Sequence, residues 1–323
     1  MKRLGSRPPP LQEVAAGLDP GGPTAGRLDE LLHKTSRTFA LSIPVLPQPT
    51  RREVTVAYLL FRVADTLEDA TAWTPPERLD ELERFGRLMR EEPGDGPAEL
   101  AARWEAHPPV VHGGYRELLA DLPAVFEAFR RLAPPARELV RQHTLRTAAR
   151  MASFVRQAAG RGGGGLADVE ELRAYCYAVA GIVGEMLTEL FLLGRPALAP
   201  IAAELRARAA RFGEALQLVN ILKDSDSDAG EGRRFLPTAV DRAEVLALAR
   251  GDLDEARKYV LDLQRSGAPR GLVAFTALPV LLARGTLDRV ERQGPGAKLT
   301  RPEVAALVAG LDAALDAGRP AIP

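Results

Sequence analysis

The sequence lacks the features that mark several large classes of protein. Its 323 residues include one cysteine, Cys176, so no disulfide can form within the chain and nothing indicates an oxidising compartment. Lysine plus arginine and aspartate plus glutamate each number 43, which leaves no net charge to attract nucleic acid or an anionic membrane. Aromatic residues make up only 5% but hydrophobic residues make up 46%, so the chain can bury a sizeable core.

Long uncharged stretches are also absent. No run reaches the roughly 18 residues of a membrane span; the longest are 38–50, which prolines interrupt, and 271–283. The first 26 residues carry basic residues, proline and glycine, but no apolar stretch of signal-peptide length. We therefore expect a cytoplasmic protein without a transmembrane segment, in which residues 1–26 form a flexible leader and residues 27–323 form one domain.

Strand signals are missing, and helical periodicity takes their place. No window alternates with a period of two, whereas apolar residues recur at i, i+3, i+4 and i+7 from residue 27 onward. Proline and glycine clusters separate the predicted helices, which cover 27–39, 50–71, 77–91, 97–106, 114–132, 135–159, 168–193, 198–228, 241–248, 251–265, 269–287 and 302–317. The fold class expected is all-α, in a single domain.

Several familiar site motifs fail on their context. Gly160, Gly162 and Gly165 match GxGxxG, but a helical segment precedes them where a dinucleotide site needs a strand. The four histidines show no zinc-binding spacing, and neither GxSxG nor a P-loop occurs. We read the glycines as a helix connector and Cys176 as a packed small residue.

A polar stripe interrupts the apolar helix that contains YLLFRVADTLED. Tyr58, Arg62, Asp65 and Asp69 are spaced four, three and four residues apart and so share one helix face. Buried carboxylates need partners because an unpaired buried charge costs several kcal/mol. Arg62 can pair with one of them, so this motif alone is also consistent with a structural ion pair on a partly wet face.

A second stripe lies in ALQLVNILKDSDSD. Gln217, Asn220, Asp224 and Asp228 share one face of another apolar helix, whereas Asp226 points away and is expected to be solvated. Two such stripes predict carboxylates opposed across a cavity, where each like-charge pair at roughly 6 Å costs about 3 kcal/mol at a dielectric near 20. All-oxygen ligands favour Mg²⁺, and nearby arginines (Arg37, Arg62, Arg233 and Arg234) suit a diphosphate. The pattern indicates metal-assisted departure of diphosphate.

The chain resembles the squalene/phytoene synthase family, all-α enzymes that join two isoprenoid diphosphates head to head. The resemblance runs in order from about residue 35 to residue 287, through TSRTFALSIPVLP, YLLFRVADTLED, YCYAVAGIVGEMLTELF, ALQLVNILKDSDSD with GRRFLP, and ALPVLLARGTL. It implies an isoprenoid-synthase-type helical bundle around a central apolar cavity.

The resemblance also implies roles for individual residues. Mg²⁺ would be held by Asp65, Glu68, Asp69, Asn220, Asp224 and Asp228. Diphosphate and substrate would contact Arg37, Arg62, Phe39, Gln217, Lys223 and Arg233, while Tyr58 and Tyr175 fall on the family's active-site tyrosines. Lys223 stands where the family usually has arginine, which weakens a bidentate contact. Phe39 is equally consistent with core packing.

The cavity itself is expected to be a deep apolar tunnel for two prenyl chains. Its lining would include Phe39, Phe61, Leu187, Phe191, Val219 and Leu222, together with the π faces of the two tyrosines. Gly181 and Gly184 lie inside a predicted helix, and two readings stay open for them. Their missing side chains make room for a prenyl chain, or they allow close helix packing.

The product expected is squalene, made from two farnesyl diphosphates through presqualene diphosphate with Mg²⁺ and NADPH. Lys298 and Arg301 resemble a basic segment that squalene synthases place near the nicotinamide, and they are also consistent with a solvated loop. The alternatives are a phytoene or dehydrosqualene synthase, with farnesyl or geranylgeranyl diphosphate and no reduction, a presqualene diphosphate synthase, and a terpene cyclase. A helical scaffold protein is disfavoured by the apolar flanks of both stripes. A lipid product also implies transient membrane contact.

Overall fold

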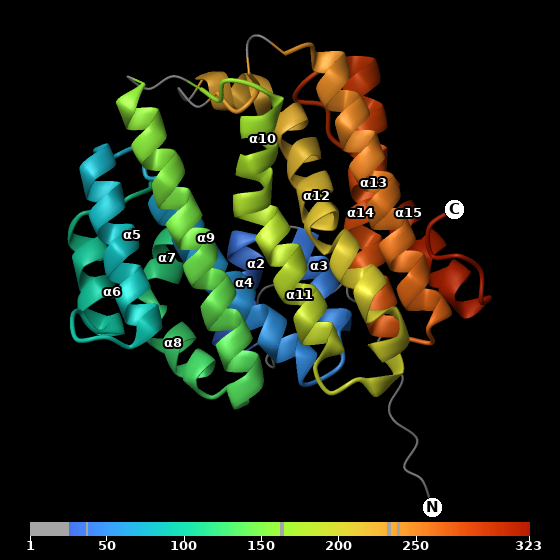
Figure 1. The fold of residues 1–323 in the computed structure, drawn as a ribbon, viewed down its shortest axis with the longest axis horizontal. Coiled ribbons are helices and arrows are strands. Elements are labelled where there is room, and N and C mark those ends of the chain that lie inside the picture. The colour runs from blue at the N-terminus through green and yellow to red at the C-terminus, as the bar shows by residue number, and fades with distance from the viewer. Residues whose placement is uncertain (1–25, 37, 162–164, 231–233, 238–239) are drawn as a thin grey trace, which may run out of the picture.

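The computed structural model describes residues 26–323 except 37, 162–164, 231–233 and 238–239. The expected leader over 1–26 therefore lies outside the described residues, apart from Gly26. Within the described part the chain forms helices and no strand, as Figure 1 shows. The all-α prediction is confirmed.

The helices follow one another with short connections. In chain order they are α2 (Arg27–Thr35), α3 (Thr38–Ser42), the 3₁₀ turn η1 (Ile43–Val45), α4 (Thr50–Glu68), α5 (Pro75–Arg90), α6 (Pro97–Ala106), α7 (Gly113–Ala120), α8 (Leu122–Arg130), α9 (Pro134–Gly160), α10 (Val169–Cys176), the π-helical turn η2 (Tyr177–Gly181), α11 (Ile182–Leu192), the 3₁₀ turn η3 (Pro196–Ile201), α12 (Ala202–Gly230), α13 (Arg242–Arg265), α14 (Arg270–Gln293) and α15 (Arg301–Asp316).

Three predicted boundaries are wrong. The helix expected over 114–132 is two helices, because the chain turns at Asp121 and Pro123 opens the next helix, where its missing N–H is tolerated. The helices expected over 241–248 and 251–265 are one, because Gly251 continues α13 and does not end it. The helix expected over 27–39 ends at Thr35, and α3 begins at Thr38.

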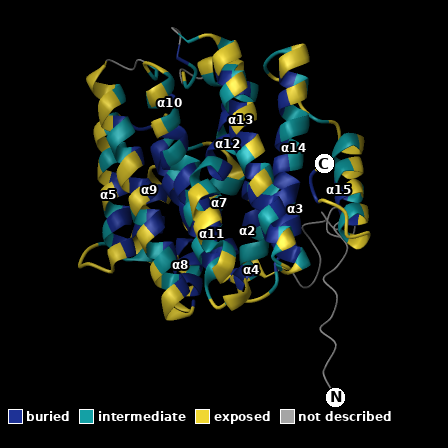
Figure 2. Ribbon diagram, turned by 45° about the vertical axis from the view of Figure 1, so that its right-hand side comes forward, coloured by how far each residue is buried: buried dark blue, intermediate teal, exposed yellow. Residues whose placement is uncertain are grey.

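Helix α4 lies inside the bundle and is buried along most of its length. It packs against α9 and α5 on one side and against α2, α7 and α8 on the others. Figure 1 shows α5 and α6 at one end of the molecule, α13 to α15 at the other, and α9 to α12 between them. Exposed residues lie mainly on the outward faces of these helices, and buried residues between them (Figure 2).

The stretch from η2 into α11 approaches α12 until the two backbones touch. A Cβ atom at Gly184 would lie 2.0 Å from the Ala209 carbonyl oxygen, and one at Gly213 would lie 2.0 Å from the Ala180 carbonyl oxygen. Gly181 also faces α12, since its Cβ would lie 3.4 Å from the Ala210 carbonyl oxygen and 3.3 Å from a Glu214 carboxylate oxygen. The packing interpretation of Gly181 and Gly184 is therefore confirmed, and the expectation that they make room for a prenyl chain is wrong.

Two helical stretches are long and apolar enough to cross a membrane by length and composition alone. They are Val169–Leu192 and Arg270–Gln293, each with a mean hydropathy of 1.3 over 18 residues. The expectation of no span rested on the absence of a fully uncharged run, which is a stricter criterion. Of the two windows, 61% and 67% of the residues are buried inside the bundle, as in core helices.

Candidate active site

Three carboxylates gather on the last turn of α4. Oxygens of Asp65, Glu68 and Asp69 all lie within 4.8 Å of one another. The carboxylates lie at the negative end of the helix dipole and repel one another, and no basic residue in that turn offsets their charge. An all-oxygen donor set of this size and charge fits a hard cation such as Mg²⁺.

Arg62 lies one turn before this cluster. Its guanidinium pairs with Asp65 and lies over the rings of Tyr58 and Tyr115. Burial lowers the pKa of Arg62, but the charge of Asp65 and the two tyrosines outweigh that effect and hold the pKa above its ordinary value. The Tyr58 hydroxyl donates to the Thr35 carbonyl at 2.8 Å, which ties α4 to the end of α2. The predicted ion pair within the first stripe is thus present.

Tyr175 reaches the same cluster from α10. Its ring stacks on Phe235 with 4.8 Å between centroids and meets Phe154 edge-on at 5.3 Å. Burial raises the pKa of Tyr175 well above 10, and the charges of Glu68, Asp69 and Asp65 raise it further. The hydroxyl therefore stays protonated and can donate a hydrogen bond beside the carboxylates.

An ion-pair network fastens α10 in this position. Arg173, two residues before Tyr175, pairs with Glu214 of α12 at 3.1 Å, and Arg211 pairs with Asp252 of α13 at 2.7 Å. Asp252 is fully buried, and a buried carboxylate without a charged partner is strongly destabilising, so its pairing with Arg211 is required for stability. Burial raises the pKa of Glu214 despite its arginine partner.

A cavity of about 310 Å³ opens at the acidic cluster. Its described lining comes from five segments: Glu68 and Asp69; Thr71, Trp73 and Arg78; Phe154, Val155, Gln157, Ala158 and Arg161; Gly165, Leu166, Glu171 and Tyr175; and Arg234 and Phe235. This volume is at the low end of ligand pockets, which span roughly 300–1,000 Å³. The cavity is where the sequence places it, but it is smaller and more polar than a tunnel for two prenyl chains.

Most of the predicted lining residues do not surround this cavity. Five of those residues (Phe61, Leu187, Phe191, Val219 and Leu222) are buried in the core and do not line this cavity. Phe39 packs on Tyr58, with 5.4 Å between ring centroids, and it too is absent from the lining. Helix periodicity identified buried positions but did not tell which of them face the cavity and which face a neighbouring helix.

The second acidic stripe lies on α12. Gln217, Asp224 and Asp228 are partly buried, Asn220 is exposed, and Asp226 is exposed as expected. The Lys223 ammonium pairs with Asp224 at 3.0 Å and donates to Asn220 at 3.4 Å, so it lies among its own motif's side chains. None of these residues is among the described lining of the cavity. Their approach to the first stripe remains a prediction.

Two features connect this stripe to the rest of the site, one along the chain and one hydrogen bond. Arg234 and Phe235, which follow it in the chain, line the cavity together with Glu68 and Asp69. The Gly296 N–H donates to the Lys223 carbonyl at 2.7 Å, which brings to the stripe the loop that contains Lys298 and precedes Arg301, the first residue of α15. Both of those side chains are exposed. Arg37 and Arg233, expected to bind diphosphate, lie outside the described residues.

Most of the lining residues, and Tyr115 beside Arg62, escaped the sequence analysis. Arg78, Phe154 and Phe235 are examples from the lining. Phe235 stands inside GRRFLP, where the arginines drew attention. No sequence pattern links Tyr115, Phe154 or Arg78 to the acidic motif, because their contacts are tertiary.

The described residues form an all-α bundle in which a cluster of three carboxylates lies beside Arg62 and a cavity. A family model, Squalene/phytoene synthase, matches residues 32–243. The chain belongs to the squalene/phytoene synthase family.

Individual relatives agree with this assignment. Squalene synthase of Candida albicans is 29% identical over 218 residues, which are 66% of this chain and 45% of that protein. Squalene synthase 1 of Arabidopsis thaliana is 29% identical over 294 residues, 83% of this chain and 65% of that protein. The matched region thus spans about half the length of several of these relatives.

Solved structures share the fold. The ligand complex of TcSQS superposes with a TM-score of 0.69 at 24% identity, covering 90% of this chain and 86% of that one. A dehydrosqualene synthase complex gives 0.55 at 19% identity, covering 95% and 98%.

Proposed function

We propose that this protein joins two farnesyl diphosphates head to head through presqualene diphosphate to squalene and releases two diphosphates. The observation that carries the proposal is the meeting of the α4 carboxylates, Arg62 and Tyr175 at one end of the bundle, beside the cavity. Membership of the family and the squalene synthases among its relatives support it.

The α4 carboxylates would hold Mg²⁺, joined by the second stripe of α12. When bound, Mg²⁺ supplies charge neutralisation for the departing diphosphate. Arg62 contributes a permanent positive charge and planar donors for diphosphate oxygens. The protonated hydroxyl of Tyr175 donates to an oxygen at the same place, and its ring offers a π face to cationic carbon.

Water must be kept from a prenyl cation, since it would capture the cation as an alcohol. Tyr175 with its flanking Phe154 and Phe235 closes part of the cavity wall with aromatic surface. NADPH would supply hydride for the reductive second step. Two exposed basic residues are available to its phosphates, Lys298 on the loop that bonds to Lys223 and Arg301 at the start of α15.

A product assay tests the proposal. The protein is incubated with farnesyl or geranylgeranyl diphosphate and Mg²⁺, with and without NADPH, and the extracts are analysed for hydrocarbons. Squalene that forms only with farnesyl diphosphate and NADPH is expected. Phytoene, dehydrosqualene, accumulated presqualene diphosphate or a cyclic terpene would each replace the squalene assignment with the corresponding reaction.

We also propose a cytoplasmic location with transient membrane contact during product release. The balanced charge and the single, buried cysteine support the compartment. Cell fractionation tests it, and a protein found wholly in the membrane fraction after a carbonate wash would contradict it.

A further inference from the structure

Two aromatic rings flank the Arg62 guanidinium. Its central carbon lies 5.6 Å from the ring centroid of Tyr58 and 5.5 Å from that of Tyr115. Tyr58 precedes Arg62 by one turn of α4, whereas Tyr115 comes from α7. The Arg62 Nε is buried and makes no hydrogen bond to a described residue. Ring contacts and the Asp65 ion pair are therefore what orient this guanidinium.

The start of α7 is built to bring Tyr115 close. The His112 side chain caps the helix by accepting from the Tyr115 N–H at 3.4 Å, and the two rings lie 4.4 Å apart. Next to it, a Cβ at Gly114 would lie 2.5 Å from the Lys34 carbonyl oxygen. Only glycine permits α7 to approach α2 this closely. The approach occurs at the residue directly before Tyr115.

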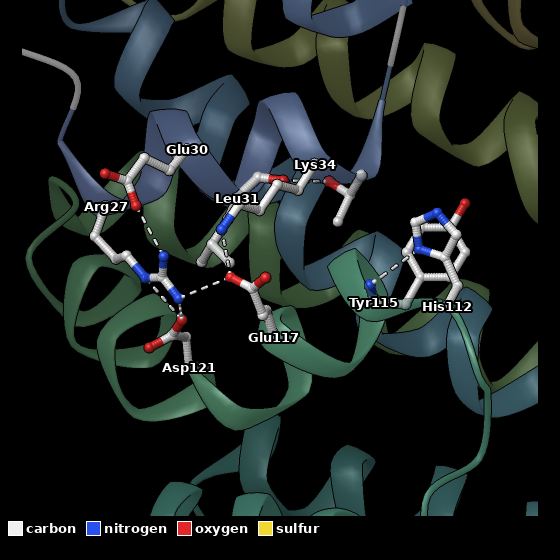
Figure 3. A network of polar contacts seen from close by, with 9 residues as sticks. Arg27, Glu30, Leu31, Lys34, His112, Tyr115, Glu117 and Asp121 are labelled. Carbon is white, nitrogen blue, oxygen red and sulfur yellow. Dashed lines mark hydrogen bonds and ion pairs between the residues drawn. The ribbon is translucent and has the colours of Figure 1, made fainter. Parts of the chain in front are cut away.

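Ion pairs also hold the two helices together, as Figure 3 shows. Lys34 pairs with Glu117 at 2.5 Å, and Arg27 pairs with both Glu117 and Asp121. Each pair is partly exposed and contributes little alone, but together they connect two positions on α2 with two on α7. The α7 helix is therefore anchored to α2 through side chains other than Tyr115.

We infer that Tyr115 is a positioning residue for Arg62, holding the guanidinium in the orientation in which it receives diphosphate. This inference rests on the proposed function. Asp65 is also a candidate cation ligand, and a carboxylate that binds a cation gives up part of its hold on Arg62. When Asp65 binds a cation, the two rings keep the guanidinium in place. The ring of Tyr58 belongs to α4 itself, whereas the ring of Tyr115 comes from α7 and holds Arg62 from outside that helix.

The test measures binding of inorganic pyrophosphate in the presence of Mg²⁺ by calorimetry. Tyr115→Leu is expected to weaken binding about 5- to 30-fold, as loss of one desolvated cation–π contact implies. Tyr115→Phe keeps the ring and is expected to bind within about twofold of the wild type. Tyr177→Leu is the matched control, because Tyr177 is also partly buried and also contacts an arginine, Arg146, away from the acidic cluster.

A second arm separates positioning from general damage to the fold. In an Arg62→Gln background, Tyr115→Leu should cause no further loss, because no guanidinium remains to be oriented. The Arg62 Nε–H NMR resonance should lose the part of its ring-current shift that Tyr115 supplies in Tyr115→Leu and keep it in Tyr115→Phe. Equal weakening in the Gln background, or an unchanged resonance, would overturn the inference.

The result also distinguishes the inference from the function on which it rests. A wild type that binds no pyrophosphate with Mg²⁺ would refute both. If the wild type binds pyrophosphate and Tyr115→Leu binds it equally tightly, only the role of Tyr115 is refuted.

Discussion

Adding one methyl group at Gly184 tests the contact between α11 and α12. In Gly184→Ala the new Cβ would lie 2.0 Å from the Ala209 carbonyl oxygen and 3.3 Å from the Gly213 nitrogen. Both neighbours are backbone atoms of α12, so a side-chain rotation cannot relieve the clash. The two helices must separate, and overpacking of this kind costs about 1–3 kcal/mol.

The same substitution also improves the helix. Replacing glycine by alanine inside a helix stabilises it by about 0.5–1 kcal/mol where space is free. The net expectation for Gly184→Ala is therefore a loss of about 1 kcal/mol of unfolding free energy, from the difference between the middle values of the two terms.

Gly251→Ala provides the control. Gly251 lies inside α13, and no atom lies within 4 Å of a Cβ built there, so only the gain remains. Urea denaturation of the wild type and both variants, compared at a common slope, measures the two changes. Opposite signs are expected. If Gly184→Ala were as stable as Gly251→Ala, the close contact between α11 and α12 would not exist as described.

Three further predictions follow from the site and the core. Asp65→Asn should remove measurable turnover and lower the unfolding free energy by about 1 kcal/mol, because the partly buried Arg62 loses its ion pair; activity assays and urea denaturation check this, and full turnover would exclude Asp65 as a ligand. Mg²⁺ with pyrophosphate at about 100 times its dissociation constant should stabilise the wild type by about 2.7 kcal/mol, and Asp224→Ala should lose most of this effect; an undiminished thermal shift in the variant would remove Asp224 from the site. Burial lowers the pKa of His143 below 6.5, so the contribution of the neutral imidazole to the unfolding free energy is complete above pH 6.5 and is lost as the pH falls through the lowered value. His143→Gln should therefore reduce the loss of stability between about pH 6.5 and 5, measured by denaturation at each pH. An unchanged pH profile would contradict this expectation.

Local patterns in the sequence predicted those parts of the site that lie on one helix. Tyr58, Arg62 and Asp65 recur at helical spacing, and the structure joins them as that spacing requires. Periodicity also located the helices, because it reports burial. It failed at Gly251, where glycine usually signals a break but continues the helix.

Contacts between helices could not be predicted in the same way. Tyr115 and Arg62 are separated by a long stretch of chain, and their contact depends on how α7 approaches α2 at Gly114. The role of Gly184 was equally undecided, since a missing side chain serves a cavity or a neighbouring helix alike. Only the position of the Ala209 carbonyl distinguishes the two.

The wall of the cavity on α9 has a consequence for how substrate size can change. Val155 and Ala158 contribute apolar side chains to it that carry no charge and no hydrogen-bonding group, whereas Phe154 also packs on Tyr175. The acidic cluster, by contrast, is built on α4. Under the proposed function, substitutions at Val155 and Ala158 would therefore change the space for a longer or shorter prenyl tail while α4 keeps the acidic cluster.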